Sequence, residues 1–367
     1  MQGALRTRII VAMSGGVDSA VAAARLVDQG HDVVGVTLHL WDYPDAPDAK
    51  AHGRCCAPED QYDARRQADA LGIPHFTFDR RELFASTVVA PFVDAYLAGE
   101  TPSPCTACNR GVKLRELFAL ADRLGAASVA TGHYARMGQT ADGRPFLREG
   151  RDPQKDQSYF LYATPEAELA RLVFPLGEST KGEVRAEAVA RKIPGANKGE
   201  SQELCFVGAG ASAYASFVEE RAGTRLRPGP IVDAEGRTVG THAGIHKFTI
   251  GQRRGLGVAL GKPAFVSSID PDTATVHLTP GDALGACTTH VDDLVLAPGV
   301  ALPFDARVRV RYRHEGAPAR IEAREGGNAA SITFENPVRA VSRGQIAVFY
   351  DGDRVLGGGR ICYAASA

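Results

Sequence analysis

The sequence has no long apolar run: none of its 367 residues belongs to a stretch near the roughly 20 apolar residues that a membrane-spanning helix needs. The N-terminal sequence MQGALRTRIIVAMSGG lacks the apolar core and cleavage site of a signal peptide. An excess of either charge is also missing, because 42 basic and 43 acidic residues leave a formal net charge of −1. We therefore expect a cytoplasmic protein without membrane contacts, in which any binding of nucleic acid relies on local basic patches.

Cysteines are few, and their odd number does not predict a disulfide framework in a cytoplasmic chain. Only Cys105 and Cys108 have the spacing typical of metal or redox sites. The adjacent pair Cys55 and Cys56 would chelate one metal poorly, so we interpret both as buried or loop thiols. The remaining three cysteines are Cys205, Cys287 and Cys362, and the last two are expected to be small packing residues.

The first 200 residues alternate between strand and helix patterns, which predicts a parallel sheet covered by helices on both faces. The expected strands are 7–12, 32–40, 73–78 and 128–131. The expected helices are 19–29, one that begins near Pro58, and 113–124. Segment 43–54 is rich in Asp, Ala and Pro, and we expect it to be a mobile loop.

Turn signals multiply after about residue 205. Pairs such as Pro271-Asp272 and Pro280-Gly281 separate short β-branched runs, among them 273–278 and 307–312. We therefore expect an α/β fold in which a parallel-sheet domain, residues 1–205, precedes two smaller β-rich domains, residues 206–285 and 286–367.

A glycine loop, residues 14–19 with the sequence SGGVDS, joins the first expected strand to the first expected helix. Its glycines allow the backbone to approach a phosphate, and the helix N-terminus offers N–H donors and the positive end of a dipole. No Gly-Lys-Ser/Thr follows, so this is not a Walker loop. A turn without a ligand is the alternative, but glycine, Asp18 and Ser19 together at the first βα junction favour a nucleotide site.

The loop resembles the pyrophosphate loop of N-type ATP pyrophosphatases, and this resemblance implies ATP as a substrate. Asp18 would then help to hold Mg²⁺, since a hard cation prefers carboxylate oxygen.

Longer segments resemble one family, the bacterial tRNA-specific 2-thiouridylases. They follow in family order at residues 12–19, 54–56, 101–109, 130–135, 155–161, 174–177, 204–207, 249–257, 311–313 and 344–345. The resemblance implies an ATP pyrophosphatase domain (adenine nucleotide alpha hydrolase-like), a small central domain and a C-terminal β-barrel that contacts tRNA. It also implies replacement of the C2 oxygen of the wobble uridine by sulfur in tRNAs for Lys, Glu and Gln.

The chemistry implied by this family begins with the adenylation of a poor leaving group. Transfer of AMP to the uridine C2 oxygen releases pyrophosphate, and sulfur then attacks C2 and expels AMP. Alignment of the base with the ATP phosphorus would supply much of the rate gain.

Residue roles follow from the same resemblance. ATP would contact Ala12, Met13, Ser14, Gly15, Gly16, Val17, Asp18, Ser19, Leu38 and Gly132. The target base would lie against Ser103, Pro104 and Cys105. The tRNA, bound by its anticodon stem-loop, would contact His133, Lys155, Asp156, Gln157, Arg311, Tyr312 and Gln345. Many members have Met where this chain has Leu38, and an apolar contact to adenine survives that change.

The catalytic cysteines of the family match Cys108 and Cys205. In the usual scheme Cys205 carries a persulfide and Cys108 assists the release of its sulfur, which requires accessible thiolates. This chain departs from many members at Cys105, where they have Asp. Three cysteines, Cys105, Cys108 and Cys205, suit a 4Fe–4S cluster with one open iron that binds sulfide, and we favour this reading. Persulfide catalysis with Cys105 as a bystander is the rival, and structural zinc fits less well. The sulfur donor is therefore a persulfide carrier or sulfide.

Four arginines alternate near the C-terminus, at positions 307, 309, 311 and 313. In a strand, period-two spacing places all four side chains on one face, which would suit phosphates or a solvated edge. The family match at Arg311 and Tyr312 favours RNA.

Two other functions use parts of this pattern. A small-molecule synthetase would share the ATP loop but has no need for Cys105, Cys108 and Cys205. A non-enzymatic RNA-binding protein with a vestigial nucleotide fold would bind tRNA without ATP dependence and release no AMP.

Overall fold

The computed structural model describes residues 7–42, 58–199, 204–208, 210, 213–259 and 261–365, and the expected loop 43–54 with Cys55 and Cys56 lies outside this range. The chain forms two compact units. The first consists of residues 1–88, 105–207 and 353–355, and the second of 89–104, 208–352 and 356–367. Among the described residues, no helix combines the length and apolarity needed to cross a membrane.

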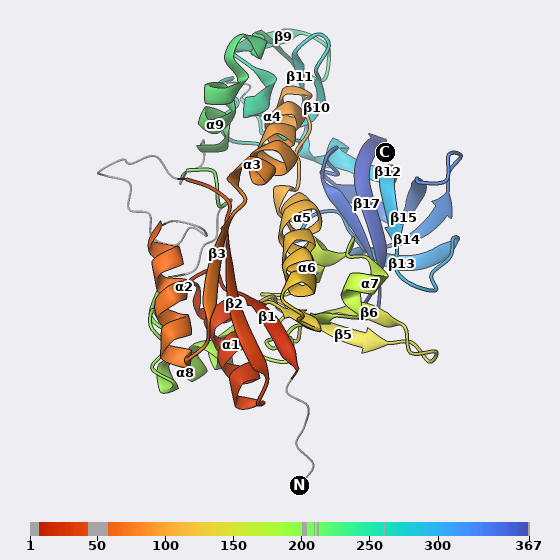
Figure 1. The fold of residues 1–367 in the computed structure, drawn as a ribbon. Helices are drawn as coiled ribbons and strands as arrows, with labels where there is room; N and C mark the ends of the chain where they lie inside the picture. The colour runs from red at the N-terminus through yellow and green to blue at the C-terminus, as the bar shows by residue number, and fades with distance from the viewer. Residues whose placement is uncertain are drawn as a thin grey trace. The chain divides into compact units, whose positions relative to one another are not determined.

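A parallel sheet forms the centre of the first unit, as predicted (Figure 1). Its strand order is β3-β2-β1-β4-β7, and each neighbouring pair is parallel. The strands are β1 (Arg8–Ala12), β2 (Asp32–His39), β3 (His75–Asp79), β4 (Ser128–Ala130) and β7 (Leu172–Val173). The apolar runs of β1 and β2 are buried almost throughout, as expected for strands with both faces covered.

Helix α1 (Val17–Asp28) is rich in alanine, which allows close packing on several sides. One side contacts α8 (Lys181–Ala190) through Val184 and Ala188, and another packs with Val11, Val33 and α2 (Pro58–Leu71). The expected helix 113–124 is α6 (Leu114–Arg123), and the strand expected at 73–78 begins at His75 instead. The alternation read from the sequence is therefore confirmed, with boundaries that shift by one or two residues.

Shorter elements complete the first unit. They are α3 (Arg81–Phe84), the π-helical turns η1 (Ala85–Val89) and η2 (Asn109–Lys113), α5 (Pro104–Cys108), β5 (Ala135–Gln139), β6 (Pro145–Glu149), η3 (Ser158–Leu161) and α7 (Glu166–Leu169). Strands β5 and β6 form an antiparallel hairpin. Asp353 joins this hairpin, since its carboxylate pairs with Arg136 and Arg148.

The second unit begins with helix α4 (Ala90–Leu97) and continues with α9 (Ala213–Ala222). A four-stranded sheet of order β10-β11-β8-β9 follows, built around the buried residues Ile231, Val266 and Val276. Its elements are η4 (Gly223–Arg225), β8 (Gly229–Val232), β9 (Thr238–His242), η5 (Ile245–Lys247), β10 (Phe265–Asp270) and β11 (Thr275–Thr279).

A closed antiparallel barrel of six strands ends the second unit and confirms the β-barrel expectation. After η6 (Gly281–Leu284), the strands are β12 (Gly285–Leu296), β13 (Phe304–Arg309), β14 (Ala317–Ala323), β15 (Ala330–Arg339), β16 (Ile346–Asp351) and β17 (Arg354–Ala365). Their order is β12-β15-β14-β13-β16-β17, and pairing of β12 with β17 closes the ring. Val291, Ile321 and Phe349 are among the fully buried residues of its core.

The prediction of four arginines on one strand face is wrong. Strand β13 ends at Arg309, so Arg311 and Arg313 lie in the exposed turn beyond it. Arg309 itself is 8% exposed, with its guanidinium 5.6 Å from the ring centroid of Tyr350, and it donates to the Tyr312 carbonyl. The alternation continues in the sequence while the strand stops, and period-two reasoning cannot detect that.

Candidate functional site

The glycine loop lies where the parallel sheet changes direction. From β1 the chain continues to β2 and β3 on one side, and then returns to place β4 on the other side of β1. The carboxyl ends of β1 and β4 therefore flank the crevice in which open α/β sheets bind ligands. A Cβ added to Gly132, just after β4, would lie 2.9 Å from Ser19 N and 3.2 Å from Asp18 Cβ. Gly132 thus has to be small for α1 to start where it does.

The loop itself is held in shape by its own atoms. Gly15 has φ +76°, and a Cβ there would lie 2.2 Å from the Asp60 carbonyl oxygen. Ser19 Oγ accepts from Ser14 N at 3.2 Å and donates to the Gly16 carbonyl at 2.9 Å. Gly16 is the N-cap of α1, and no described side chain caps the helix there. The first turn of α1 is therefore left with N–H donors suited to an anion.

Asp18, in that first turn, is held by a cation and a hydroxyl. Lys181 Nζ lies 2.7 Å from each carboxylate oxygen of Asp18, and Tyr134 Oη donates to Asp18 Oδ1 at 2.8 Å. The ammonium is also 5.9 Å from the centroid of the Tyr134 ring. The side chain of Lys181 is 12% exposed, against 32% for Asp18. The expected metal ligand is thus already neutralised by a lysine.

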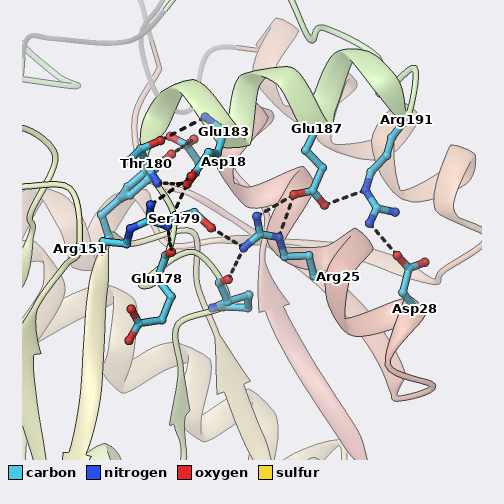
Figure 2. Close-up of polar contacts among 12 residues, drawn as sticks. Asp18, Arg25, Asp28, Arg151, Glu178, Ser179, Thr180, Glu183, Glu187 and Arg191 are labelled. Carbon is cyan, nitrogen blue, oxygen red and sulfur yellow. Dashed lines mark hydrogen bonds and ion pairs between the residues drawn. The ribbon is translucent and has the colours of Figure 1, made fainter.

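The start of α8, which presents Lys181, is capped by its own residues. Thr180 and Glu183 form a reciprocal capping box, and Lys181 N donates to Asp152 Oδ2 at 2.9 Å. Figure 2 shows Asp18 next to Thr180 and Glu183 at this end of the helix. In contrast to α1, the first turn of α8 therefore keeps few donors for a ligand, and its contribution to the site is the Lys181 side chain.

Two further ion pairs join α1 to α8 away from the loop (Figure 2). Arg25 Nη2 lies 2.6 Å from Glu187 Oε2 while Arg25 Nη1 donates to Ser179 Oγ at 2.8 Å. Arg191 pairs with Asp28 at 2.7 Å. Contacts other than the Asp18–Lys181 pair therefore also hold α1 against α8.

The other expected ATP contacts have different environments. Met13 is 2% exposed and packs in the core with Val11 and Val33, so its side chain is buried away from any ligand. Val17 is 8% and Leu38 9% exposed, while Ala12 is half-buried at the end of β1. The structure brings the backbone of residues 14–19 and Gly132 together.

His133 follows Gly132 and is half-buried. Its Nδ1 lies 2.8 Å from Thr131 Oγ1, and its ring meets Phe174 edge-on. Burial, assisted by the positive charge of Lys113, lowers the pKa of His133 to about 3. The imidazole is therefore neutral at physiological pH.

Two of the expected tRNA contacts are engaged inside the first unit. Asp156 is 3% exposed, and its Oδ1 accepts from Gly150 N and Ser158 N, both at 3.0 Å. Gln157 accepts from Tyr134 N and donates to the Tyr134 carbonyl. Lys155 is half-buried. The segment therefore positions Tyr134 and, through it, Asp18.

The cysteines come from two segments of the first unit. Cys105 and Cys108 are three residues apart on α5, and Cys105 is exposed while Cys108 is buried. Cys205 is half-buried, and its neighbour Phe206 packs edge-on against Trp41 and Phe84 with centroids 6.2 and 5.6 Å apart.

Gln345 and the segment before α5 lie together in the second unit. Gln345 Nε2 donates to the Thr101 carbonyl at 2.9 Å, and Thr101 N donates to the Arg343 carbonyl at 2.8 Å. Ser103 is half-buried and Pro104 is buried. In the described structure Gln345 supports the loop that was expected to hold the target base.

Comparison with known proteins decides the family. Residues 7–209 match the family described as tRNA methyl transferase HUP domain, 215–280 its PRC-barrel domain, and 293–361 an aminomethyltransferase beta-barrel domain. A protein of Sorangium cellulosum named tRNA-specific 2-thiouridylase MnmA is 62% identical over 358 residues, which cover 96% of this chain and 92% of that one. Relatives of the same name from Geotalea uraniireducens and a Roseiflexus species are 44% and 45% identical, covering 98% and 96% of this chain and 96% and 99% of theirs. The chain belongs to the tRNA-specific 2-thiouridylase family.

Membership in the 2-thiouridylase family confirms the expected resemblance. The donor atoms of the described residues indicate which metals the site could hold. Mg²⁺ is commonly held by one or two carboxylates together with substrate phosphates, and the partly exposed carboxylate of Asp18 beside the uncapped turn of α1 fits that pattern. A 4Fe–4S cluster fits less well, because no three His, Cys, Asp or Glu residues of the described ranges form a group able to hold a metal ion.

Sequence reasoning missed Lys181 and Tyr134 as partners of Asp18 in the candidate site. Each lies far in sequence from its partner: Asp18 and Lys181 are separated by 163 residues. A Thr-Lys-Gly-Glu sequence does signal a capped helix start at Thr180, and that signal alone would have placed Lys181 at a helix N-terminus.

Proposed function

We propose that this protein uses ATP to replace the C2 oxygen of a tRNA wobble uridine with sulfur. The observation that supports it is the uncapped glycine loop at the switch point of the sheet, packed against Gly132, in a chain of the 2-thiouridylase family. The substrates are the tRNAs for Lys, Glu and Gln, bound by the anticodon stem-loop, and the protein works in the cytoplasm. We also propose that the chain divides into three domains, residues 1–205, 206–285 and 286–367.

The glycine loop, residues 14–19, binds the phosphates of ATP. Backbone donors of residues 14–19 bind them, Asp18 holds Mg²⁺, and Leu38 and Gly132 line the nucleotide site. A Mg²⁺ ion held by Asp18 would supply positive charge against the charge that develops on the leaving pyrophosphate. The uridine oxygen attacks the α-phosphorus, and the resulting adenylate makes C2 open to sulfur.

The sulfur step is assigned to Cys205 as persulfide carrier and Cys108 as the thiol that releases the sulfur. This route needs two cysteines, whereas a cluster needs Cys105, Cys108 and Cys205 to converge. Cys105 is exposed, Cys108 buried and Cys205 half-buried, so both routes stay predictions, and iron analysis decides between them. In the persulfide route the donor is a persulfide carrier, which passes its outer sulfur to Cys205. Release of that sulfur by the Cys108 thiolate would leave a Cys108–Cys205 disulfide, which a thiol reductant then returns to two thiols. Free sulfide would serve as donor in the cluster route alone.

The tRNA is proposed to contact Arg311, Tyr312 and Lys155, and the flipped uridine to reach Ser103 and Pro104. Flipping a base of a single-stranded loop costs only a few kcal/mol, which this contact can offset. Asp156, Gln157 and Gln345 are better explained as supports of these contacts, given their hydrogen bonds within the protein.

The test measures AMP and thiolated nucleoside together, with cognate tRNA and a persulfide or sulfide source. The wild-type protein should release AMP only in the presence of tRNA and should form 2-thiouridine. Cys108→Ser should lose the thiolated product, whereas the matched control Cys287→Ser, at an exposed barrel position, should retain it. AMP release with a small-molecule acceptor would favour a synthetase, and ATP-independent tRNA binding without AMP would favour a binding protein.

A further inference from the structure

The segment before helix α5, residues 99–103, is attached to the C-terminal barrel, and we call it the base loop. Thr101 N donates to the Arg343 carbonyl at 2.8 Å. Gln345 Nε2 donates to the Thr101 carbonyl at 2.9 Å and to the Pro102 carbonyl at 3.4 Å. A turn of the barrel therefore binds the polar backbone groups of this loop.

Two glycines allow the base loop to lie close to its supports. A Cβ added to Gly344, in the barrel turn, would lie 2.9 Å from Glu100 Cβ and 3.1 Å from Thr101 N. A Cβ added to Gly99 would lie 2.8 Å from Ile269 Cγ2, which belongs to the four-stranded sheet. The loop is thus packed against both β structures of the second unit, without space for an added methyl group at either glycine.

Glu100 is the one charged residue of the base loop. Its side chain is 13% exposed, and its carboxylate oxygens lie 3.4 Å from Arg343 Nη2 and 3.1 Å from Arg360 Nη1. Arg360 is itself fixed on β17, because its Nε and Nη2 donate to Asp292 on the paired strand β12 at 3.0 and 2.7 Å. The barrel therefore presents two guanidinium groups that bind the carboxylate of Glu100.

Closure of the barrel does not depend on Glu100. Strands β12 and β17 pair over much of their length, and Asp292 already neutralises Arg360. The contact made by Glu100 adds the attachment of the base loop, which leads directly to Ser103 and Pro104, where the flipped uridine is proposed to lie. A side chain that touches no ligand can in this way set the position of residues that do.

We propose that Glu100 is a positioning residue for thiolation: paired with Arg343 and Arg360, it holds the base loop in the position that receives the target uridine. The proposal rests on the proposed function. A displacement of about 1 Å in a reacting group can lower a rate by about a hundredfold, so a small shift of this loop is costly. Loss of the pair leaves the residues proposed to bind ATP and the tRNA backbone untouched. The expected signature is therefore a lower kcat with unchanged affinities.

The experiment measures steady-state formation of 2-thiouridine by the full chain, with cognate tRNA and a persulfide or sulfide source. Glu100→Gln keeps the shape of the side chain and removes its charge. It should lower kcat by about 3- to 30-fold, while KM for tRNA and Kd for ATP change less than about twofold. Arg360→Gln removes a partner of Glu100 and should also lower kcat. The double variant should lose less than the product of the two single losses, because both changes break one contact.

Asp305→Asn is the matched control, since it breaks the ion pair of Asp305 with Arg320 elsewhere on the barrel and should leave kcat unchanged. Neither Glu100→Gln nor the control should change the melting temperature much, because partly exposed pairs contribute little to stability. Hydrogen exchange gives a second measurement that does not need activity: the Thr101 amide, bound to the Arg343 carbonyl, should exchange faster in Glu100→Gln than in the control.

Three results would each overturn the positioning role of Glu100: an unchanged kcat, single losses that multiply in the double variant, or unchanged exchange of the Thr101 amide. A wild-type protein that forms no 2-thiouridine would instead overturn the proposed function. In that case the exchange of Thr101 would still decide whether Glu100 holds the base loop.

Discussion

Gln157 binds both backbone polar groups of Tyr134. Its side-chain Oε1 accepts from Tyr134 N at 3.0 Å, and its backbone N donates to the Tyr134 carbonyl at 2.8 Å. Tyr134 in turn donates to Asp18. A residue expected to touch RNA thus supports the nucleotide site from behind.

Gln157→Ala should therefore lower the free energy of unfolding by about 1–3 kcal/mol, because a buried backbone N–H loses its acceptor. Urea unfolding followed by the fluorescence of Trp41, the one tryptophan of the chain, measures this in the first unit. Gln157→Glu keeps the acceptor and should be milder. If Gln157→Ala weakened tRNA binding without a loss of stability, Gln157 would be an RNA contact instead.

Gly132→Ala should weaken ATP binding about tenfold or more. The added methyl would lie 2.9 Å from Ser19 N, a backbone atom that cannot move without shifting the start of α1. Gly182→Ala is the control: it lies in α8 with only Thr180 Oγ1 at 4.0 Å, and alanine there should slightly stabilise the helix. Equal ATP affinity in both variants would show that Gly132 does not shape the site.

Arg309 and Arg311 should behave differently although both belong to the alternating arginines. Arg309→Ala removes a buried guanidinium stacked near Tyr350 and should cost about 1–3 kcal/mol of barrel stability. Arg311→Ala, at an exposed position, should leave stability nearly unchanged and reduce the salt dependence of tRNA binding by about one phosphate contact. Thermal unfolding and tRNA titration at several salt concentrations separate the two effects, and the same salt slope for Arg311→Ala as for the wild type would remove it from the RNA surface.

His133 makes stability depend on pH in a definite direction. Its pKa is about 3 in the folded protein, below the usual 6.5, so between these values the unfolded chain binds the extra proton. Stability from this group is full above pH 6.5 and falls as the solution is acidified. His133→Asn should reduce the loss between pH 7 and pH 5 by as much as about 2 kcal/mol, measured by urea unfolding at both pH values. An unchanged difference would show that His133 titrates normally.

Cys105→Ser should retain thiolation. The described residues include no group of three His, Cys, Asp or Glu able to hold a metal ion, so Cys105 is expected to be a bystander. The second measurement determines iron and acid-labile sulfide in anaerobically purified wild-type protein, and it tests for the cluster directly. About four irons per chain, lost together with activity in Cys105→Ser, would restore the cluster mechanism.

Features that depend on residues close together in the chain could be predicted from the sequence. The buried runs of β1 and β2, and the turn at Gly15 and Gly16, follow from residues close together in the chain, so the parallel sheet and its loop could be placed in advance. Lys181 and Tyr134 could not, since their contact with Asp18 depends on how α8 and β5 return to α1. The arginine row failed for a related reason: nothing local marks Arg309 as the last residue of its strand.

The closed barrel has a consequence for the order of biosynthesis. Strand β17 completes the ring by pairing with β12, yet it is translated after the other five strands. Until it emerges from the ribosome, β12 and β16 each present an unpaired edge that invites association with other nascent chains. A shortened chain without β17 should therefore be recovered mainly in inclusion bodies, even if its parallel-sheet unit has already folded.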